Sequence, residues 1–282
     1  SSTRKSVQRV CGAAQTCIGL PSACEAAARA IQGMWDDGET EVVLLVDARN
    51  AFNRLARQRA LRTARERCPD ISVALQNFYG AHSELHLGDG NMLLSKEGTT
   101  QGCPLGMAMY AIGSLPLIEV AQGKHSRQVW YADDSAAAGS VNGVRQWFSR
   151  LQEDGPEFGY EVNLSKTVAI VKPESHGSFM RLFAGLTDIE KDGIRVICVG
   201  IDDLDKVEGP EANRCLGRRY LGAGIGSDTF RALRRRLKVG SVMWSGLPHG
   251  TDTSAPSLLP AREVPAPQVA LHDADGQGAG GG

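Results

Sequence analysis

Hydrophobic positions along the chain follow two periods, one typical of buried strands and the other of helices with a single apolar face. Residues 41–46 are a nearly continuous run of valine and leucine, which indicates a strand buried on both faces. Val144, Trp147, Phe148 and Leu151 recur at helical spacing and predict a helix with one buried stripe. Residues 1–40 also read as helical, because an alanine-rich stretch within them has high helix propensity.

The segments between these elements predict a further helix, a hairpin and a long apolar helix. A helix over residues 54–67 places Leu55, Ala60, Leu61 and Ala64 inward and its arginines outward. Residues 82–87 and 91–94 flank an Asp-Gly pair, which indicates a hairpin. Pro104 opens an apolar helical segment that ends near residue 120 and follows the loop of residues 97–102.

Two acidic residues stand at the junction of two short strands. Residues 127–132 and 135–138 alternate as strands joined at Asp133 and Asp134, and Lys166 precedes another strand over residues 167–171. Strands that alternate with hairpins and helices predict an α+β fold with a mainly antiparallel sheet covered by helices. From residue 245 onward prolines and glycines dominate, so we expect a disordered tail there.

Composition narrows the class of protein. The chain has 282 residues, of which 42% are apolar, enough for a buried core. Its seven cysteines form no C-x-x-C pair, so we expect reduced, mostly buried thiols. No apolar stretch is long enough to span a bilayer and no secretory signal is seen, so we expect a soluble protein. His82 and His86 would lie about 13 Å apart on a strand, too far to share a metal ion.

Charge is segregated although the formal net charge is only −1. Arginines gather between residues 49 and 67 and again between 231 and 238. Each run is compatible with the solvated face of a helix, and also with contact to nucleic-acid phosphates. The candidates for such backbone contact are Arg54, Arg57, Arg234 and Arg235.

The strand over residues 41–46 is followed at once by Asp47. If Asp47 and Asp133 meet in the fold, they can share two divalent cations, the usual apparatus of phosphoryl transfer. Acidic residues at a turn also serve simply as turn formers, so the pair alone leaves both interpretations open.

Five ordered motifs between residues 41 and 222 resemble the palm of a reverse transcriptase, most closely that of non-LTR (LINE-type) retrotransposons. They are Asp47-Ala48-Arg49-Asn50-Ala51-Phe52, Gly98-Thr99-Thr100-Gln101-Gly102-Cys103-Pro104-Leu105, Tyr131-Ala132-Asp133-Asp134, the segment from Gly159 to Thr167, and Tyr220-Leu221-Gly222. Group II intron proteins and other cellular reverse transcriptases are alternative relatives. The resemblance implies a polymerase palm over residues 41–225, after a partial fingers region at 1–40 and before a thumb remnant at 226–244 and the tail at 245–282. Because only 46 residues precede Asp47, we expect a fragment.

The resemblance also implies roles for the metal-binding residues. Asp47 and Asp133 would hold two Mg²⁺ ions, for which Mn²⁺ can substitute, with Asp134 as a further partner and the carbonyl of Ala48 completing one shell. Lys166 would protonate the departing pyrophosphate.

Roles for nucleotide and primer contacts follow from the same resemblance. Phe52 would pack beneath the incoming sugar and exclude a 2′-hydroxyl, although a core phenylalanine is a serious alternative. Gln101 and Gly102 would approach the nascent base pair. The primer end would be contacted by Tyr131, Tyr220, Leu221 and Gly222.

These inferences predict an RNA-directed DNA polymerase that transfers deoxynucleotides to a primer 3′-hydroxyl. Its partners would be an RNA template, a DNA primer and deoxynucleoside triphosphates, with no membrane, and the family resemblance favours the nucleus. The alternative is an inactive remnant that at most binds nucleic acid through its arginine-rich helices.

Overall fold

A five-stranded sheet forms the centre of the computed structural model, which describes residues 2–12, 14–187, 192–199, 217–221, 223–227 and 231. The strand order is β4-β5-β1-β6-β7, and every neighbouring pair is antiparallel except β6 and β7. These strands are β1 (Val42–Ala48), β4 (Ser126–Tyr131), β5 (Asp134–Gly139), β6 (Val162–Val171) and β7 (Arg195–Cys198). The predicted α+β class with a mainly antiparallel sheet is confirmed.

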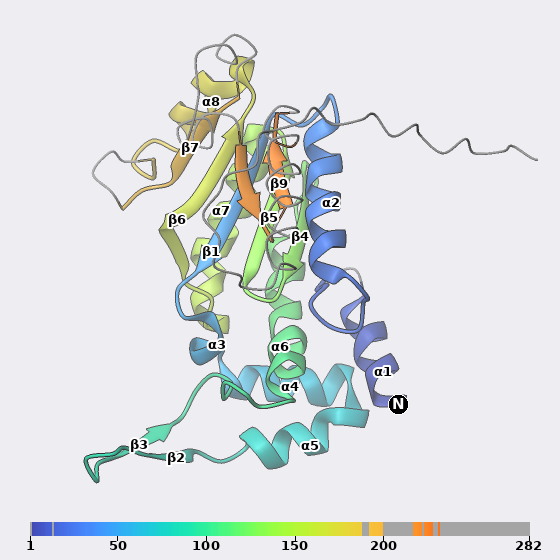
Figure 1. The fold of residues 1–282 in the computed structure, drawn as a ribbon, viewed down its shortest axis with the longest axis vertical. Coiled ribbons are helices and arrows are strands. Elements are labelled where there is room, and N and C mark those ends of the chain that lie inside the picture. The colour runs from blue at the N-terminus through green and yellow to red at the C-terminus, as the bar shows by residue number, and fades with distance from the viewer. Residues whose placement is uncertain are drawn as a thin grey trace, which may run out of the picture. The chain divides into compact units, whose positions relative to one another are not determined.

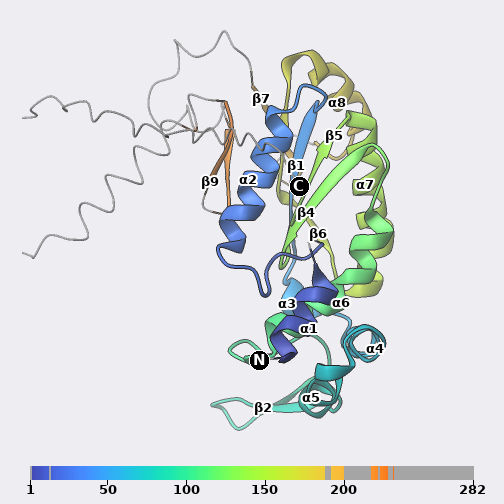
Figure 2. The ribbon, with the colours of Figure 1, turned by 90° about the vertical axis from the view of Figure 1, so that its right-hand side faces the viewer.

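Elements cover both faces of this sheet, which explains the unbroken apolar run of β1. Helix α2 (Ala23–Asp36) lies on one face, with the hairpin of β8 (Gly217–Tyr220) and β9 (Ala223–Gly226) on that same side. Helices α6 (Gly106–Ala121) and α7 (Val141–Asp154) lie on the other face (Figure 2). Val43 and Leu45 pack toward α2, whereas Leu44 and Val46 pack toward α6 and α7, so both sets are buried.

Several predicted elements are confirmed with small shifts in their bounds. Helix α7 buries all four residues of its predicted stripe. The hairpin of β2 (Ser83–His86) and β3 (Met92–Ser95) turns at the Asp-Gly pair, and His82 and His86 are exposed as expected. The helical region of residues 1–40 is interrupted, since α1 (Ser2–Cys11) ends well before α2 begins. Lys166 lies within β6 rather than ahead of a strand.

The region after Asp47 differs most from the prediction. The single helix expected over residues 54–67 is two helices, α3 (Ala51–Arg54) and α4 (Arg57–Arg67). The hydrophobic pattern does not predict helix α5 (Pro69–Tyr79), because exposed Val73 and Phe78 obscure its buried stripe. The chain also contains α8 (His176–Leu182) and two 3₁₀ turns, Gly155–Phe158 and Pro173–Ser175. In Figure 1, α4, α5 and the β2-β3 hairpin lie beyond one end of the sheet.

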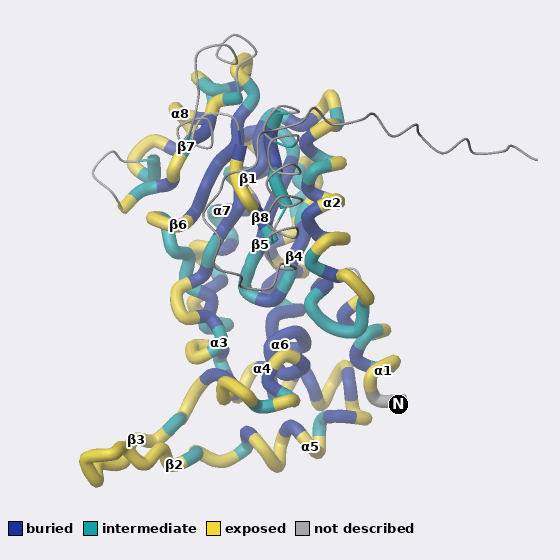
Figure 3. Tube along the Cα trace, viewed as in Figure 1, coloured by how far each residue is buried: buried dark blue, intermediate teal, exposed yellow. Residues whose placement is uncertain are grey.

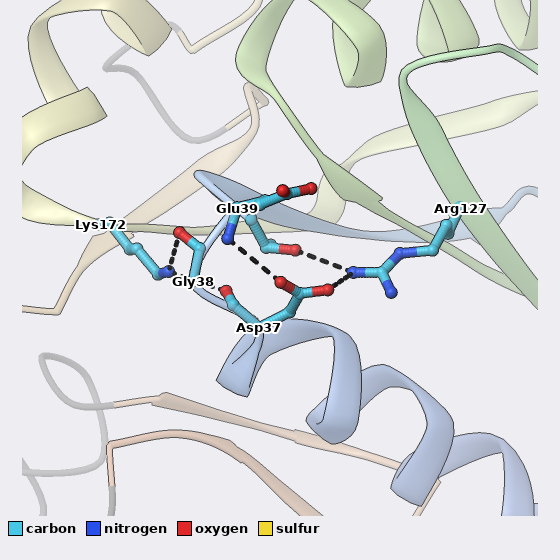
Figure 4. Close-up of polar contacts among 6 residues, drawn as sticks. Asp37, Gly38, Glu39, Arg127 and Lys172 are labelled. Carbon is cyan, nitrogen blue, oxygen red and sulfur yellow. Dashed lines mark hydrogen bonds and ion pairs between the residues drawn. The ribbon is translucent and has the colours of Figure 1, made fainter.

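A polar cluster fixes the connection between α2 and β1 at the opposite end of the sheet (Figure 4). Arg127 of β4 donates to the Asp37 carboxylate at 2.7 Å, and Lys172 after β6 donates to the Asp37 carbonyl at 3.1 Å. The backbone N–H of Glu39 also donates to that carboxylate, and with Arg127 it lowers the pKa of Asp37. The edge strand β4 and the end of β6, which β5 and β1 separate in the sheet, therefore both hold the same turn.

Burial separates the sheet core from the β2-β3 hairpin, which is exposed on both faces (Figure 3). Among the described cysteines, the expected burial of the thiols is complete only for Cys11 and Cys68, whereas Cys17, Cys24 and Cys103 are half-buried. No helix among the described residues is long and apolar enough to cross a membrane. The predicted thumb remnant, apart from residues 226, 227 and 231, and the tail lie outside the described residues, so these boundaries stay predictions.

Candidate active site

The ends of β1 and β5 bring Asp47 and Asp134 onto the same face of the sheet. Leu45 pairs with Ala136, and both side chains pack on the α2 face. Because side chains alternate along a strand, Asp47 and Asp134 project from that face two residues further on. The adjacent register pair, Val46 with Ser135, makes these aspartates neighbours across the two strands.

Asp133 lies in the two-residue turn that joins β4 to β5. Tyr131 pairs with Asp134 across this turn, and Ala132 takes a positive φ of 54°. The hydroxyl of Tyr160, a buried residue, donates to the carbonyl of Asp133 at 3.1 Å and bonds the Ser135 hydroxyl at 2.8 Å. Asp133 therefore lies at a hairpin tip, as predicted, and the hydrogen bond from Tyr160 fixes its backbone.

The carboxylates at this site disfavour one another's charge. Burial, followed by the charges of Asp133 and Asp47, raises the pKa of Asp134 to about 6. Burial and the Asp47 charge also raise the pKa of Asp133, while nearby Lys166 opposes that shift. Uncompensated acids in a partly dry site are a recognised signature of functional positions.

Asp47 has two polar partners on β6. The Lys166 ammonium lies 3.7 Å from its carboxylate, and the Asn163 amide donates to the same oxygen at 3.4 Å. The Lys166 side chain is 67% exposed, so the pair is weak and the ammonium can move toward a ligand. The fold thus brings together Asp47, Asp133 and Lys166, which lie in three separate motifs of the sequence.

A pocket of about 190 Å³ opens beside these acids. Its lining includes Asp47, Asp134, Lys166, Arg218, Arg219 and Tyr220. The hydroxyl of Tyr220 is buried and has no hydrogen-bond partner among the residues that the structure describes, which leaves a donor for a ligand or water. Sequence reasoning missed Arg218 and Arg219, although two arginines directly before the predicted primer element were a signal for them.

A larger cavity of about 370 Å³ lies at the opposite end of the sheet, lined by Asp37, Glu39, Lys124 and Arg127 among others. Its Asp37 carboxylate is already paired with Arg127. The smaller pocket is the better candidate, because the pKa of Asp134 there is raised whereas contacts with Glu39 and Arg127 lower the pKa of Asp37.

The donor set at the smaller pocket suits a hard divalent cation, since carboxylate oxygens are the ligands that Mg²⁺ prefers. A bound cation would favour the charged carboxylates, against the burial and mutual repulsion that raise the pKa of Asp133 and Asp134. Within the part of the chain that the structure describes, no three His, Cys, Asp or Glu side chains already form a group able to hold a metal. Ala48 ends β1 and is buried, and nothing in its position tests the predicted carbonyl ligand.

The residues predicted to meet the nucleotide lie in α3 and in the turn that precedes α6. Phe52 stacks on Tyr110 with ring centroids 4.4 Å apart, which fixes its ring. The residue is half-buried. Gln101 and Gly102 are exposed in a turn, where Gly102 has a φ of 85° that favours glycine.

The predicted primer contacts show mixed exposure. Tyr131 is half-buried, and a hydrogen bond with Cys24 together with burial raises its pKa to about 12. Tyr220 is buried and Leu221 is half-buried. Gly222 lies outside the described residues.

Three arginines of the first basic run form ion pairs within the chain. Arg54 pairs with Glu161, Arg59 with Glu157, and Arg67 with Glu119. The prediction that the arginines face outward is wrong for Arg57, which is 1% exposed. Its guanidinium donates to the carbonyls of Ser95, Glu97 and Gly98 and to the Ser95 hydroxyl, so it cannot contact phosphate. Arg234 and Arg235 lie outside the described residues.

Comparison with known proteins gives a likeness in fold. No protein-family model and no curated protein matches the chain. The structure of apo telomerase from Candida Tropicalis is 12% identical over 60% of this chain and 36% of its own, with a TM-score of 0.47. Telomerase from Candida albicans in complex with a TWJ fragment of telomeric RNA is 15% identical over 60% of this chain and 34% of its own, with a TM-score of 0.46. The chain spans about a third of the length of these telomerases, and at such identities the likeness concerns the fold alone.

Proposed function

We propose that this chain carries the palm of an RNA-directed DNA polymerase from a non-LTR retrotransposon, which transfers deoxynucleotides to a primer 3′-hydroxyl. One observation carries the proposal. Asp47 and Asp134 come from adjoining strand ends and Asp133 from the turn beside them, where burial and then the neighbouring carboxylate charges raise the pKa of Asp133 and Asp134. Such acids suit binding of the divalent cations that phosphoryl transfer requires.

Asp47 and Asp133 are the proposed ligands of two Mg²⁺ ions, with Asp134 beside them and the Ala48 carbonyl as a further donor. Bound Mg²⁺ supplies activation of the primer hydroxyl and neutralisation of the leaving pyrophosphate. The Asn163 amide and the Lys166 ammonium orient the Asp47 carboxylate. Lys166 is also the proposed proton donor to the pyrophosphate, since its exposed ammonium faces the same pocket.

Substrate contacts are proposed around these acids. Phe52, held by its stack on Tyr110, would form a rigid floor that leaves no room for a 2′-hydroxyl. Gln101 and Gly102 would approach the nascent base pair, and Tyr131, Tyr220 and Leu221 the primer end. The RNA template, the DNA primer and a nuclear location are parts of the same proposal.

Primer extension on an RNA template, with Mg²⁺ or Mn²⁺, tests this proposal. We expect extension by the wild-type chain and its loss in Asp133→Ala, because one proposed metal ligand is gone. Asp89→Ala is a matched control, since Asp89 is an exposed turn acid remote from the sheet. Extension that survives in Asp133→Ala would refute the metal assignment.

The rival function, nucleic-acid binding by an inactive remnant, requires free arginines. The ion pairs of Arg54, Arg59 and Arg67 and the burial of Arg57 reduce the charge that the first basic run offers to phosphates. Arg62 and Arg65 of the same run stay exposed. Steeply salt-dependent binding to an RNA–DNA duplex, without nucleotide incorporation, would support the rival over the polymerase.

A further inference from the structure

We propose that Gln15 is a positioning residue that holds the backbone of the turn carrying Asp133 and Asp134; its value for catalysis rests on the proposed function. Gln15 lies in the loop between α1 and α2, and its side chain is fully buried. No motif quoted above includes it.

The Gln15 amide pairs with both polar backbone groups of Ala132. Its Oε1 accepts from the Ala132 N–H at 2.7 Å, and its Nε2 donates to the Ala132 carbonyl at 3.0 Å. The Gln15 side chain thus makes with Ala132 the two backbone hydrogen bonds that a neighbouring strand would make. A primary amide can make both bonds at once because it has an acceptor and two donors on one rigid plane.

The position of Ala132 explains why these two bonds matter. β4 is an edge strand, so the outward N–H and carbonyl groups near its end have no strand partner. Ala132 also has a φ of 54°, which an alanine adopts only at an energetic cost. Gln15 satisfies the outward groups and fixes the one strained residue of the turn, directly before Asp133.

The orientation of Gln15 is itself fixed. Its second Nε2 hydrogen goes to the Ser114 hydroxyl of α6 at 3.2 Å, and Ser114 in turn donates to the Ala111 carbonyl at 3.1 Å. The amide therefore has one orientation in which all its bonds are made. The turn is held from two sides, by Gln15 at the Ala132 backbone and by Tyr160 at the Asp133 carbonyl.

Thr16 offers a matched control from the same loop. Its hydroxyl donates to the carbonyl of Trp130 at 2.7 Å, and its backbone N–H donates to the same oxygen at 2.9 Å. Thr16→Val therefore removes a bond to the same edge strand, leaves the Trp130 carbonyl satisfied and leaves both Ala132 bonds intact.

The test compares Gln15→Met with Thr16→Val in the full chain. Methionine keeps the length of the side chain but cannot make the two bonds. Two quantities are measured below the unfolding transition: amide hydrogen exchange at Ala132 and Mn²⁺ affinity by electron paramagnetic resonance. We expect Gln15→Met to speed exchange at Ala132 and weaken Mn²⁺ binding by at least about tenfold, as loss of a supporting residue around a metal typically does. Thr16→Val is expected to change neither.

Three outcomes would overturn the inference. These are wild-type values of both quantities in folded Gln15→Met, an equal loss of Mn²⁺ affinity in Thr16→Val, and rapid exchange at Ala132 in the wild-type chain. Exchange at Ala132 in the wild-type chain needs no variant, so it tests whether Gln15 holds the turn even if Gln15→Met does not fold. If wild-type chain binds no Mn²⁺, the proposed function fails, while exchange at Ala132 still tests the role of Gln15 in the turn.

Discussion

Replacing Asp134 by asparagine should make the protein more stable at neutral pH while impairing its proposed metal site. The carboxyl has a pKa of about 6 against an ordinary value of 3.8, with burial as the main cause and Asp133 and Asp47 as further causes. The folded state therefore binds this proton more tightly than the unfolded state does. The resulting stabilisation is complete below about pH 4 and is lost as pH rises through about 6.

The magnitude follows from the shift. A change from 3.8 to about 6 corresponds to roughly 3 kcal/mol of unfavourable interaction for the ionised carboxylate. The side chain is half-buried, so solvent screening reduces this to about 1–2 kcal/mol. Asparagine is neutral at every pH and similar in shape. Asp134→Asn should thus raise the free energy of unfolding by about 1–2 kcal/mol at pH 8 and by almost nothing at pH 4.

Urea unfolding in the presence of a chelator, at pH 4 and pH 8, measures this difference. Asp89→Asn is the control, because hydrogen bonds from Asn91 lower the pKa of Asp89 and its substitution should not stabilise. Asp134→Asn that is less stable than wild type at pH 8, or a gain of equal size at both pH values, would refute the reasoning. Added Mg²⁺ should stabilise the wild type more than the variant.

Three further predictions concern the site and its supports. Mn²⁺ affinity should fall as pH drops through about 6, because Asp134 gains its proton there; titration calorimetry at pH 5 and pH 8 checks this. Arg57→Met should lower the free energy of unfolding by about 2–4 kcal/mol, since three carbonyls lose a buried donor, whereas Arg62→Met at an exposed position should change it by less than about 0.5 kcal/mol. Gly98→Ala should lower the free energy of unfolding more than Gly102→Ala. Both glycines have a positive φ, but only at Gly98 would a Cβ meet backbone, 2.3 Å from the Asn53 carbonyl oxygen. Urea unfolding of both variants measures the difference.

Local pattern was enough to predict the elements that carry the acids. The unbroken apolar run before Asp47 requires a strand covered on both faces, and the helical stripe of α7 requires one buried side. Both follow from periodicity, which the sequence displays directly. Helix α5 and the break before α4 were missed because exposed apolar residues and a buried arginine depart from the simple pattern.

The role of each arginine depended on contacts that no local pattern displays. Arg57 and Arg59 are two residues apart on α4, yet one is buried against the Ser95–Gly98 segment and the other is exposed and pairs with Glu157. The difference arises because the loop after β3 packs on the start of α4. A run of arginines therefore predicts charge, but the fold decides how much of that charge is free.

The sequence by itself determined which residues can bind a cation and on which element each one stands. It determined the strand before Asp47 and the hairpin at Asp133, because period and turn chemistry are local properties. Only the tertiary structure decided that these acids share one face, that burial and mutual repulsion raise the pKa of Asp134, and that Gln15 holds the turn. The physical reason is that register, burial and hydrogen bonding join residues far apart in the chain, such as Gln15 and Ala132 at a separation of 117 positions, whereas periodicity reports only on neighbours.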